Sequence, residues 1–222
     1  AIVALILSFA TWNQLFIAPL ISPSKTISAT PIVGRQDTAV DEEPKIVIPK
    51  INVDVPVVYG VNSVNEADVQ NALEDGVVHY AGTELPGERG NIVIVGHSSN
   101  NLFNSGKYKF AFVLLRRLSA EDEDLIYVHY KGTRYTYKVF NTFVVPPDQV
   151  SVLGDLEEKP NIITLITCDP PGTVTNRLIV QAEQISPDPA TNKASTTPDP
   201  ISTDTDKLPS DAPGFWSRIF GS

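Results

Sequence analysis

The only cysteine among the 222 residues, Cys168, stands where an apolar, β-branched run meets a rigid turn, in the stretch TLITCDPPGT (164–173). A thiol reacts as its thiolate, and an ordinary thiol pKa of about 8.5 leaves only a few per cent ionised at neutral pH. A single cysteine excludes a disulfide within the chain and a two-cysteine metal site. An inert buried thiol and a catalytic nucleophile both remain open.

A nucleophilic thiol needs an imidazole as base or cationic partner, and the chain has three histidines. His97 follows the apolar run NIVIVG, so we expect its side chain at the end of a strand, as for Cys168. Two strand ends on one rim of a barrel can meet although they are distant in sequence. His129, in the strand-like run IYVHYK, is expected as an ordinary exposed or cross-strand residue. His79 either lines a site or has a structural role.

Arg177 follows Cys168 by nine positions and opens the apolar run RLIV. A turn through 169–176, with two prolines and a glycine, would return the chain antiparallel and place Arg177 beside Cys168. Its guanidinium is always charged and can stabilise the oxyanion that forms when a thiolate attacks a carbonyl. The alternative is a surface arginine that begins a strand.

The elements that must position these residues are mostly strands between residues 45 and 185. Apolar runs that read as strands are KIVI, INVDVPVV, NIVIV, NIITLITC and RLIVQAE, and DLIYVHYKGTRYTYKVFNTFVV reads as a hairpin with Lys131-Gly132 at its turn. Several short strands with one or two helices indicate an all-β fold, a closed or nearly closed barrel. The clearest helix is SVNEADVQNALEDG, with Ser63 and Glu66 at capping-box spacing and Gly76 as the stop.

The two ends of the chain differ from this folded part. Residues 1–21 carry no charge and predict a transmembrane anchor, with a cleaved signal peptide and a buried core helix as alternatives. Residues 22–44 are rich in Ser, Thr, Pro and acidic residues and predict a linker. Residues 186–222 have a similar composition and predict a disordered tail. Within that tail, LPSDA (208–212) loosely resembles a sorting signal, and the idle-tail interpretation is the alternative.

The net charge of −9 argues against nucleic acid as a partner, because phosphate binding needs clustered Lys and Arg. The densest acidic groups are EDED (121–124) and DEE (41–43). They are expected to be solvated loops, and no motif specific for calcium supports activation by that ion. We expect no metal and no cofactor.

Three ordered blocks resemble the sortase family, the membrane-bound cysteine transpeptidases of bacteria. TLITC is followed nine residues later by Arg177, HYAGTELPGERGNIVIVGH (79–97) ends in Gly-His, and IVIPKINVDVPV (46–57) opens the domain. Together the blocks cover residues 45–185 in the family's order.

The resemblance implies an eight-stranded β-barrel in which Cys168 is the nucleophile, His97 the general acid/base, and Arg177 the oxyanion or substrate-positioning residue. Thr167 matches a family position that lines the substrate groove. Pro171 belongs to the proline-rich loop that follows the nucleophile, where we expect specificity, and His79 completes the expected substrate-binding set.

The resemblance further implies cleavage of a sorting signal of LPxTG type, between Thr and Gly, through a thioacyl intermediate. An amine from a cell-wall precursor or a pilin lysine would then resolve the thioester. The catalytic domain would lie on the outer face of a bacterial membrane, held by the N-terminal anchor. A thiol hydrolase with water as acceptor and an idle surface-binding barrel are the alternatives.

Overall fold

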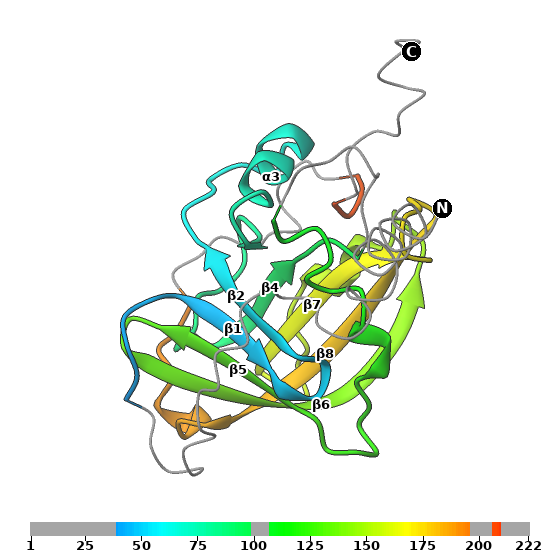
Figure 1. The fold of residues 1–222 in the computed structure, drawn as a ribbon. Coiled ribbons are helices and arrows are strands. Elements are labelled where there is room, and N and C mark those ends of the chain that lie inside the picture. Colours follow the sequence, from blue (N-terminus) through cyan, green and yellow to red (C-terminus); the bar gives the residue numbers. More distant parts are fainter. Residues whose placement is uncertain (1–38, 99–106, 196–205, 210–222) are drawn as a thin grey trace, which may run out of the picture.

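Eight strands close into a barrel in the computed structural model, which describes residues 39–98, 107–195 and 206–209 (Figure 1). The strands are β1 (Lys45–Ile48), β2 (Val53–Val58), β3 (Val77–His79), β4 (Gly90–Val95), β5 (Leu125–Tyr130), β6 (Thr133–Val145), β7 (Asn161–Asp169) and β8 (Asn176–Ser186). Around the barrel their order is β1-β2-β3-β4-β7-β8-β6-β5, and β5 pairs with β1 to close it. The expected eight-stranded all-β barrel is confirmed.

Four of the five short helical elements in the described chain lie in connections between strands, and the fifth follows β8. In chain order they are η2 (Pro49–Ile51), α3 (Glu66–Ala72), η3 (Leu115–Arg117), η4 (Val150–Leu153) and η5 (Pro189–Thr191). Only α3 is an α-helix among the described residues, and the others are single 3₁₀ turns.

Strand alternation sorts the apolar side chains into two clusters. Residues from all eight strands fill the barrel interior, and Ile92 and Ile94 of β4 belong to this set. Val93 and Val95 of the same strand face outward, because successive side chains of a strand point to opposite faces. Together with residues of other elements they form a second cluster, here called the outer cluster: Val69, Leu73, Val78, Tyr80, Val93, Val95, Val145, Val152, Leu153, Ile166, Ile179 and Leu208. The outer cluster therefore covers the outside of β4, β7 and β8.

Two of the pairings determine where the chemistry-bearing residues lie. Strands β4 and β7 run parallel, with Val95 opposite Ile166. Strands β7 and β8 form an antiparallel hairpin in which Cys168 lies opposite Arg177. The turn through 169–176 thus returns the chain as the two prolines and the glycine predicted.

The β5–β6 hairpin also follows the prediction. Its two turn residues, Lys131 and Gly132, have φ of 49° and 73°. Positive φ at both central residues is the geometry that matches the right-handed twist of the flanking strands. His129, on β5, is buried rather than exposed, and burial lowers the pKa of its imidazole.

The helix prediction was correct in place but wrong at both ends. Asn65 caps α3, since its Oδ1 accepts from the Ala67 N–H at 2.9 Å, whereas the Ser63 hydroxyl accepts from the N–H of Asn65. The helix ends at Ala72, before Gly76. Gly76 serves a different purpose, because a Cβ there would lie 2.4 Å from the Pro56 carbonyl oxygen.

The chain outside 45–185 is partly packed on the barrel, which corrects two predicted boundaries. In the predicted linker, the Val40 N–H donates to the Gly132 carbonyl at 3.0 Å. In the predicted tail, residues 186–195 and 206–209 have defined places on the barrel, which local composition did not indicate. The predicted anchor, 1–21, lies outside the described residues. No helix in the described ranges is long and apolar enough to cross a membrane.

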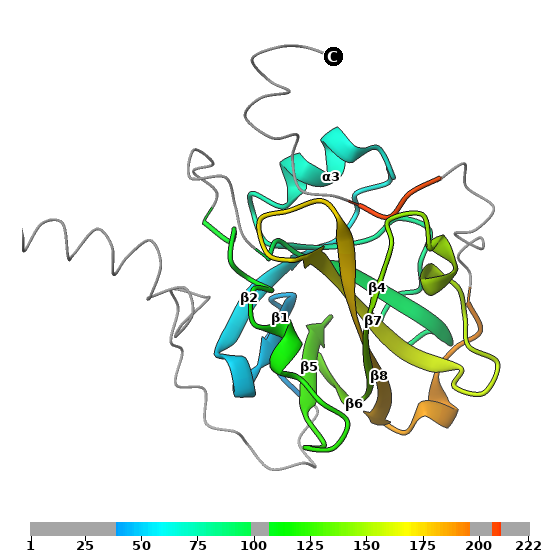
Figure 2. The same ribbon diagram turned by 90° about the vertical axis from the view of Figure 1, so that its right-hand side faces the viewer.

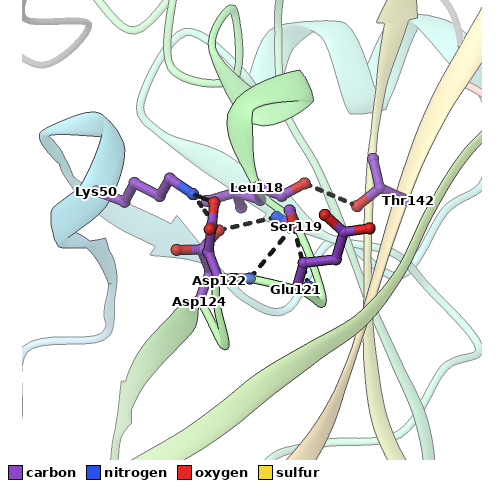
Figure 3. A network of polar contacts seen from close by, with 7 residues as sticks. All are labelled: Lys50, Leu118, Ser119, Glu121, Asp122, Asp124 and Thr142. Atoms are coloured by element: carbon purple, nitrogen blue, oxygen red, sulfur yellow. Dashed lines mark hydrogen bonds and ion pairs between the residues drawn. The ribbon is translucent and has the colours of Figure 1, made fainter.

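The acidic turn at 121–124 is organised around a lysine (Figure 3). The Lys50 ammonium lies 2.5 Å from Asp122 and 2.7 Å from Asp124, and these hydrogen bonds raise the lysine's pKa. Asp124 also accepts from the Ser119 N–H, so the carboxylates have protein partners. Within the described residues, no group of three or more His, Cys, Asp or Glu side chains is arranged to hold a metal ion.

Candidate active site

Cys168, His97 and Arg177 form one row: Cys168 lies on β7, Arg177 on β8, and His97 comes two residues after the end of β4. The β4–β7 pairing puts Val95 opposite Ile166, and the Gly96 N–H continues it by donating to the Ile166 carbonyl at 3.0 Å. The same register, carried two residues beyond the Val95–Ile166 pair, sets His97 beside Cys168. Since Cys168 is paired with Arg177 on its other side, the thiol lies between the imidazole and the guanidinium.

This row lies on the outside of the barrel. Ile166 and Ile179, two positions from Cys168 and Arg177, belong to the outer cluster, and residues two apart on a strand share a face. The three side chains are nevertheless well covered, with 5%, 5% and 2% of their surface exposed for Cys168, His97 and Arg177. The site is therefore a shielded position on the outer wall.

His97 is held by the close packing of the segment that carries it. Its carbonyl accepts from the Phe112 N–H at 2.8 Å. A Cβ on Gly96 would lie 2.5 Å from Cδ2 of the Phe112 ring, closer than real side-chain contacts allow. Glycine before the histidine is thus required by the approach of an aromatic ring.

The Arg177 guanidinium bonds only to main-chain carbonyls among the described residues. Its Nη1 donates to the carbonyls of Val174 and Asn176 at 3.1 and 2.9 Å. Its Nε and Nη2 donate to the carbonyls of Pro209 and Leu208, the second at 3.4 Å. A buried guanidinium keeps its charge and must have its donors paired, so half of that pairing comes from the C-terminal segment.

A turn between β6 and β7 supplies part of the apolar surface next to this row. Val152 and Leu153 of η4 belong to the outer cluster, and the buried Asn91 fixes the turn from beneath. The Asn91 amide lies within hydrogen-bond distance of the carbonyls of residues 152–154 at 3.0–3.1 Å, and its oxygen accepts from the Thr164 hydroxyl at 2.8 Å. Sequence reasoning missed Asn91, because one amide in a strand-like run carries no distinctive spacing.

A second unpredicted contact fixes the end of β7. The Arg116 guanidinium of η3 forms an ion pair with the Asp169 carboxylate, directly after Cys168. Pro171, predicted to bind substrate, lies exposed in the loop between Cys168 and Arg177. Its role in substrate binding stays a prediction.

Thr167 and His79 are not placed with the row. Thr167 lies on the face of β7 opposite to Cys168, and its hydroxyl donates to the Gly96 carbonyl at 2.7 Å. The Thr167 hydroxyl thus joins β7 to the residue after β4. The outward-facing side chains of β7 here are those of Ile166 and Cys168. His79 lies opposite Ile94 on β3, where its Nε2 is 2.8 Å from the Glu84 carbonyl oxygen and its ring stacks on Tyr59. Both side chains have hydrogen-bond partners within the barrel, and their role in substrate binding stays a prediction.

Two ionisable groups near the start of β4, His79 and Glu84, have shifted pKa values. Burial lowers the pKa of His79. Burial also raises the pKa of Glu84 to about 7, and the nearby Asp155 carboxylate adds to the rise. Glu84 accepts from the Ser195 hydroxyl and the Asn91 N–H, which ties the loop before β4 to the chain beyond β8.

Comparison with known proteins identifies the family. A family model described as a sortase domain matches residues 46–185. Sortase D of Bacillus subtilis (strain 168) is 29% identical over 142 residues, which are 63% of this chain and 62% of that protein, so the chain spans less than two thirds of this relative's length.

Solved structures give the same result. The sortase D5 transpeptidase of Clostridium perfringens superposes with a TM-score of 0.51 at 27% identity, covering 66% of this chain and 80% of that one. Sortase C of C. perfringens, solved with the C-terminal cell wall sorting motif, gives 0.52 at 28% identity, covering 67% and 73%. With the family model spanning the whole barrel and the row of Cys168, His97 and Arg177 in place, the chain belongs to the sortase family.

Proposed function

We propose that the chain is a transpeptidase that cleaves an LPxTG-like sorting signal and transfers its acyl part to an amine. One observation supports the proposal: the only thiol of the chain lies on β7 between the guanidinium of Arg177 on β8 and the segment after β4 that carries the His97 imidazole. A buried inert cysteine would not need this row.

The first half of the reaction forms a thioester. The Cys168 thiolate attacks the carbonyl carbon of the scissile peptide bond and gives a tetrahedral intermediate. The C–N bond then breaks, and His97 donates the proton that the leaving amine requires. The product is an acyl group on the sulfur and a free amine.

The second half reverses these steps with another amine. An amine from a cell-wall precursor or a pilin lysine attacks the thioester carbonyl, and His97 accepts its proton. The C–S bond breaks and the thiolate is restored. Because the acyl group passes from one amide to another through a thioester, the cycle is redox-neutral and calls for no cofactor in this proposal.

For Arg177, the contacts favour positioning of the substrate over stabilisation of the oxyanion. Its Nε and Nη2 donate to successive main-chain carbonyls of residues 208 and 209. An extended peptide crossing the row would present carbonyls of the same kind. Arg177 would therefore hold the peptide while the thiolate attacks another carbonyl of the same peptide.

The test is a transfer assay with the full chain, a labelled LPxTG peptide and an excess of a primary amine. We expect a transfer product and a thioacyl adduct on Cys168 in the intact-mass spectrum. Cys168→Ala should abolish both, and Ile185→Ala, on the exposed far end of β8, should leave both unchanged. Transfer by the Cys168→Ala chain would refute the assignment, and a product from water alone would make the chain a hydrolase.

The location of the enzyme follows from the sequence of residues 1–21. We propose that this uncharged stretch anchors the chain in a bacterial membrane, with the barrel on the outer face. Protease added to intact cells should then remove the barrel. Its protection until the cells are opened would contradict this topology.

A further inference from the structure

A short piece of the C-terminal tail, residues 206–209, lies against the active-site wall (Figure 2). Figure 2 draws it as the red segment, at the end of the barrel that also carries α3 and the β7–β8 loop. The Leu208 side chain is only 2% exposed and belongs to the outer cluster. Its N–H donates to the Pro147 carbonyl at 2.7 Å. Because the tail itself is polar, the burial of Leu208 depends on the apolar surface that the outer cluster provides.

The same piece is bonded to the catalytic row. Arg177 donates Nε to the Pro209 carbonyl and Nη2 to the Leu208 carbonyl. Since Arg177 is paired directly with Cys168, the Leu-Pro backbone is bonded to the residue next to the thiol. Leu208 and Pro209 are held by one apolar pocket and one guanidinium, as a bound peptide would be.

The tail sequence explains why it fits there. Residues 208–212 read Leu-Pro-Ser-Asp-Ala, so they match the LPxTG pattern at its first two positions and depart from it at the last two. In the pattern, the thiol attacks the carbonyl of the fourth residue, where this chain has Asp211. A carboxylate next to the attacked carbonyl repels a thiolate, which disfavours cleavage.

We propose that Leu208 and Pro209 form a tethered ligand that occupies the Leu-Pro subsite of the chain's own active site and blocks it. This rests on the proposed function, since it assigns the blocked site to the acyl donor. The tail binds through the two positions that the substrate shares, and it resists cleavage through the two positions that differ. The enzyme is then active only when the tail is displaced or removed.

The tether sets the strength of the block. Residues 196–205 connect the docked piece to the described chain, and a linker of this length gives an effective concentration on the order of 1 mM. If the free tail peptide binds with a dissociation constant of about 0.1 mM, the tether raises the apparent KM of a donor about tenfold. Because the tail competes for the same surface, kcat should not change.

A binding experiment tests the proposal without any turnover. The probe is a fluorescent peptide with the sequence of residues 206–212, and the receptors are the full Cys168→Ala chain and the same chain ended after residue 205. We expect the shortened chain to bind the probe at least about tenfold more tightly than the full chain does, and a probe with serine in place of its leucine to bind neither. Equal binding to both chains, or binding to neither, overturns the proposal.

Point variants with intact Cys168 repeat the test in the transfer assay. Leu208→Ser should lower the KM for an LPxTG peptide about tenfold and leave kcat unchanged. Ile201→Ser, which replaces another apolar residue of the same tail, is the matched control and should behave as the unsubstituted chain. An unchanged KM in Leu208→Ser overturns the proposal.

Two further measurements keep the outcomes separate. Addition of the tail peptide should raise the thermal midpoint of the shortened chain and not that of the full chain, which shows that the shortened chain is folded. An intact mass lacking residues 212–222 would make the tail a substrate and overturn the block. If no chain transfers any peptide but the shortened one alone binds the probe, the proposed function fails and the tethered ligand stands.

Discussion

The buried amide of Asn91 is the sharpest place to test how the active-site wall is supported. It contacts three consecutive carbonyls at residues 152–154 and accepts from Thr164, and none of its surface is exposed. Asn91→Ala removes all of these bonds and frees η4, which carries Val152 and Leu153 into the outer cluster.

The size of the effect follows from the number of bonds. The two N–H groups of the amide and its oxygen account for three hydrogen bonds, and each contributes about 1 kcal/mol net. Buried carbonyls that lose their donor add to this cost, as does the space left by the carboxamide. We therefore expect the free energy of unfolding to fall by about 3–4 kcal/mol, a large part of the 5–15 kcal/mol that a domain usually has.

Urea denaturation of the full chain followed by circular dichroism measures this change. The matched control is Asn141→Ala on β6, where the asparagine is exposed and the change should stay within about 0.5 kcal/mol. The transfer assay should show a raised KM with little change in kcat, because η4 shapes the peptide surface and not the row. A loss below about 1 kcal/mol, or an unchanged KM, would show that η4 is held by other contacts.

Three other expectations concern residues around the row. Gly96→Ala forces a Cβ into the Phe112 ring, and we expect a loss of about 1–3 kcal/mol in denaturation together with slower transfer. Burial raises the pKa of Glu84 from 4.5 to about 7 in the folded chain, so the folded state becomes less stable relative to the unfolded state as pH rises from 4.5 to 7. Glu84→Gln should therefore raise the thermal midpoint above that of the unsubstituted chain at pH 8 and not at pH 5. Calcium and EDTA should give equal transfer rates, because Lys50 and Lys138 already form ion pairs with three of the four carboxylates at 121–124, and a calcium-dependent rate would contradict this.

The pairing of Cys168 with Arg177 could be predicted from the sequence, because both residues belong to one hairpin. A β-branched run, a Pro-Pro-Gly turn and a second run predict a hairpin, and a hairpin with this loop brings Arg177 to Cys168. His97 required more, because only the parallel β4–β7 pairing brings it to the thiol, and no spacing rule predicts which strands become neighbours in a barrel. Its place was supported by the family motifs rather than by the pattern of residues alone.

Tertiary contacts decide what sequence alone left open. Thr167 was expected in the substrate groove because it matches a family position; strand alternation turns it to the face of β7 opposite Cys168, and its role in binding stays a prediction. The tail was predicted as disordered because its own composition cannot form a core. Leu208 instead completes a cluster that other elements had already built, and local composition contains no information about such a receptor.

The pairing of Arg177 with main-chain carbonyls separates two tasks within the wall. Every peptide has these carbonyls, so the guanidinium can hydrogen-bond to a peptide backbone whatever its side chains are. Under the proposed function, selectivity would then depend on the shape of the outer cluster, and hence on η4 and the ends of the strands beside it. We therefore expect substitutions in η4 to change which peptides are accepted while the thiol, the imidazole and the guanidinium stay as they are. For engineering, the turn at 150–153 is the adjustable part and the row the constant one.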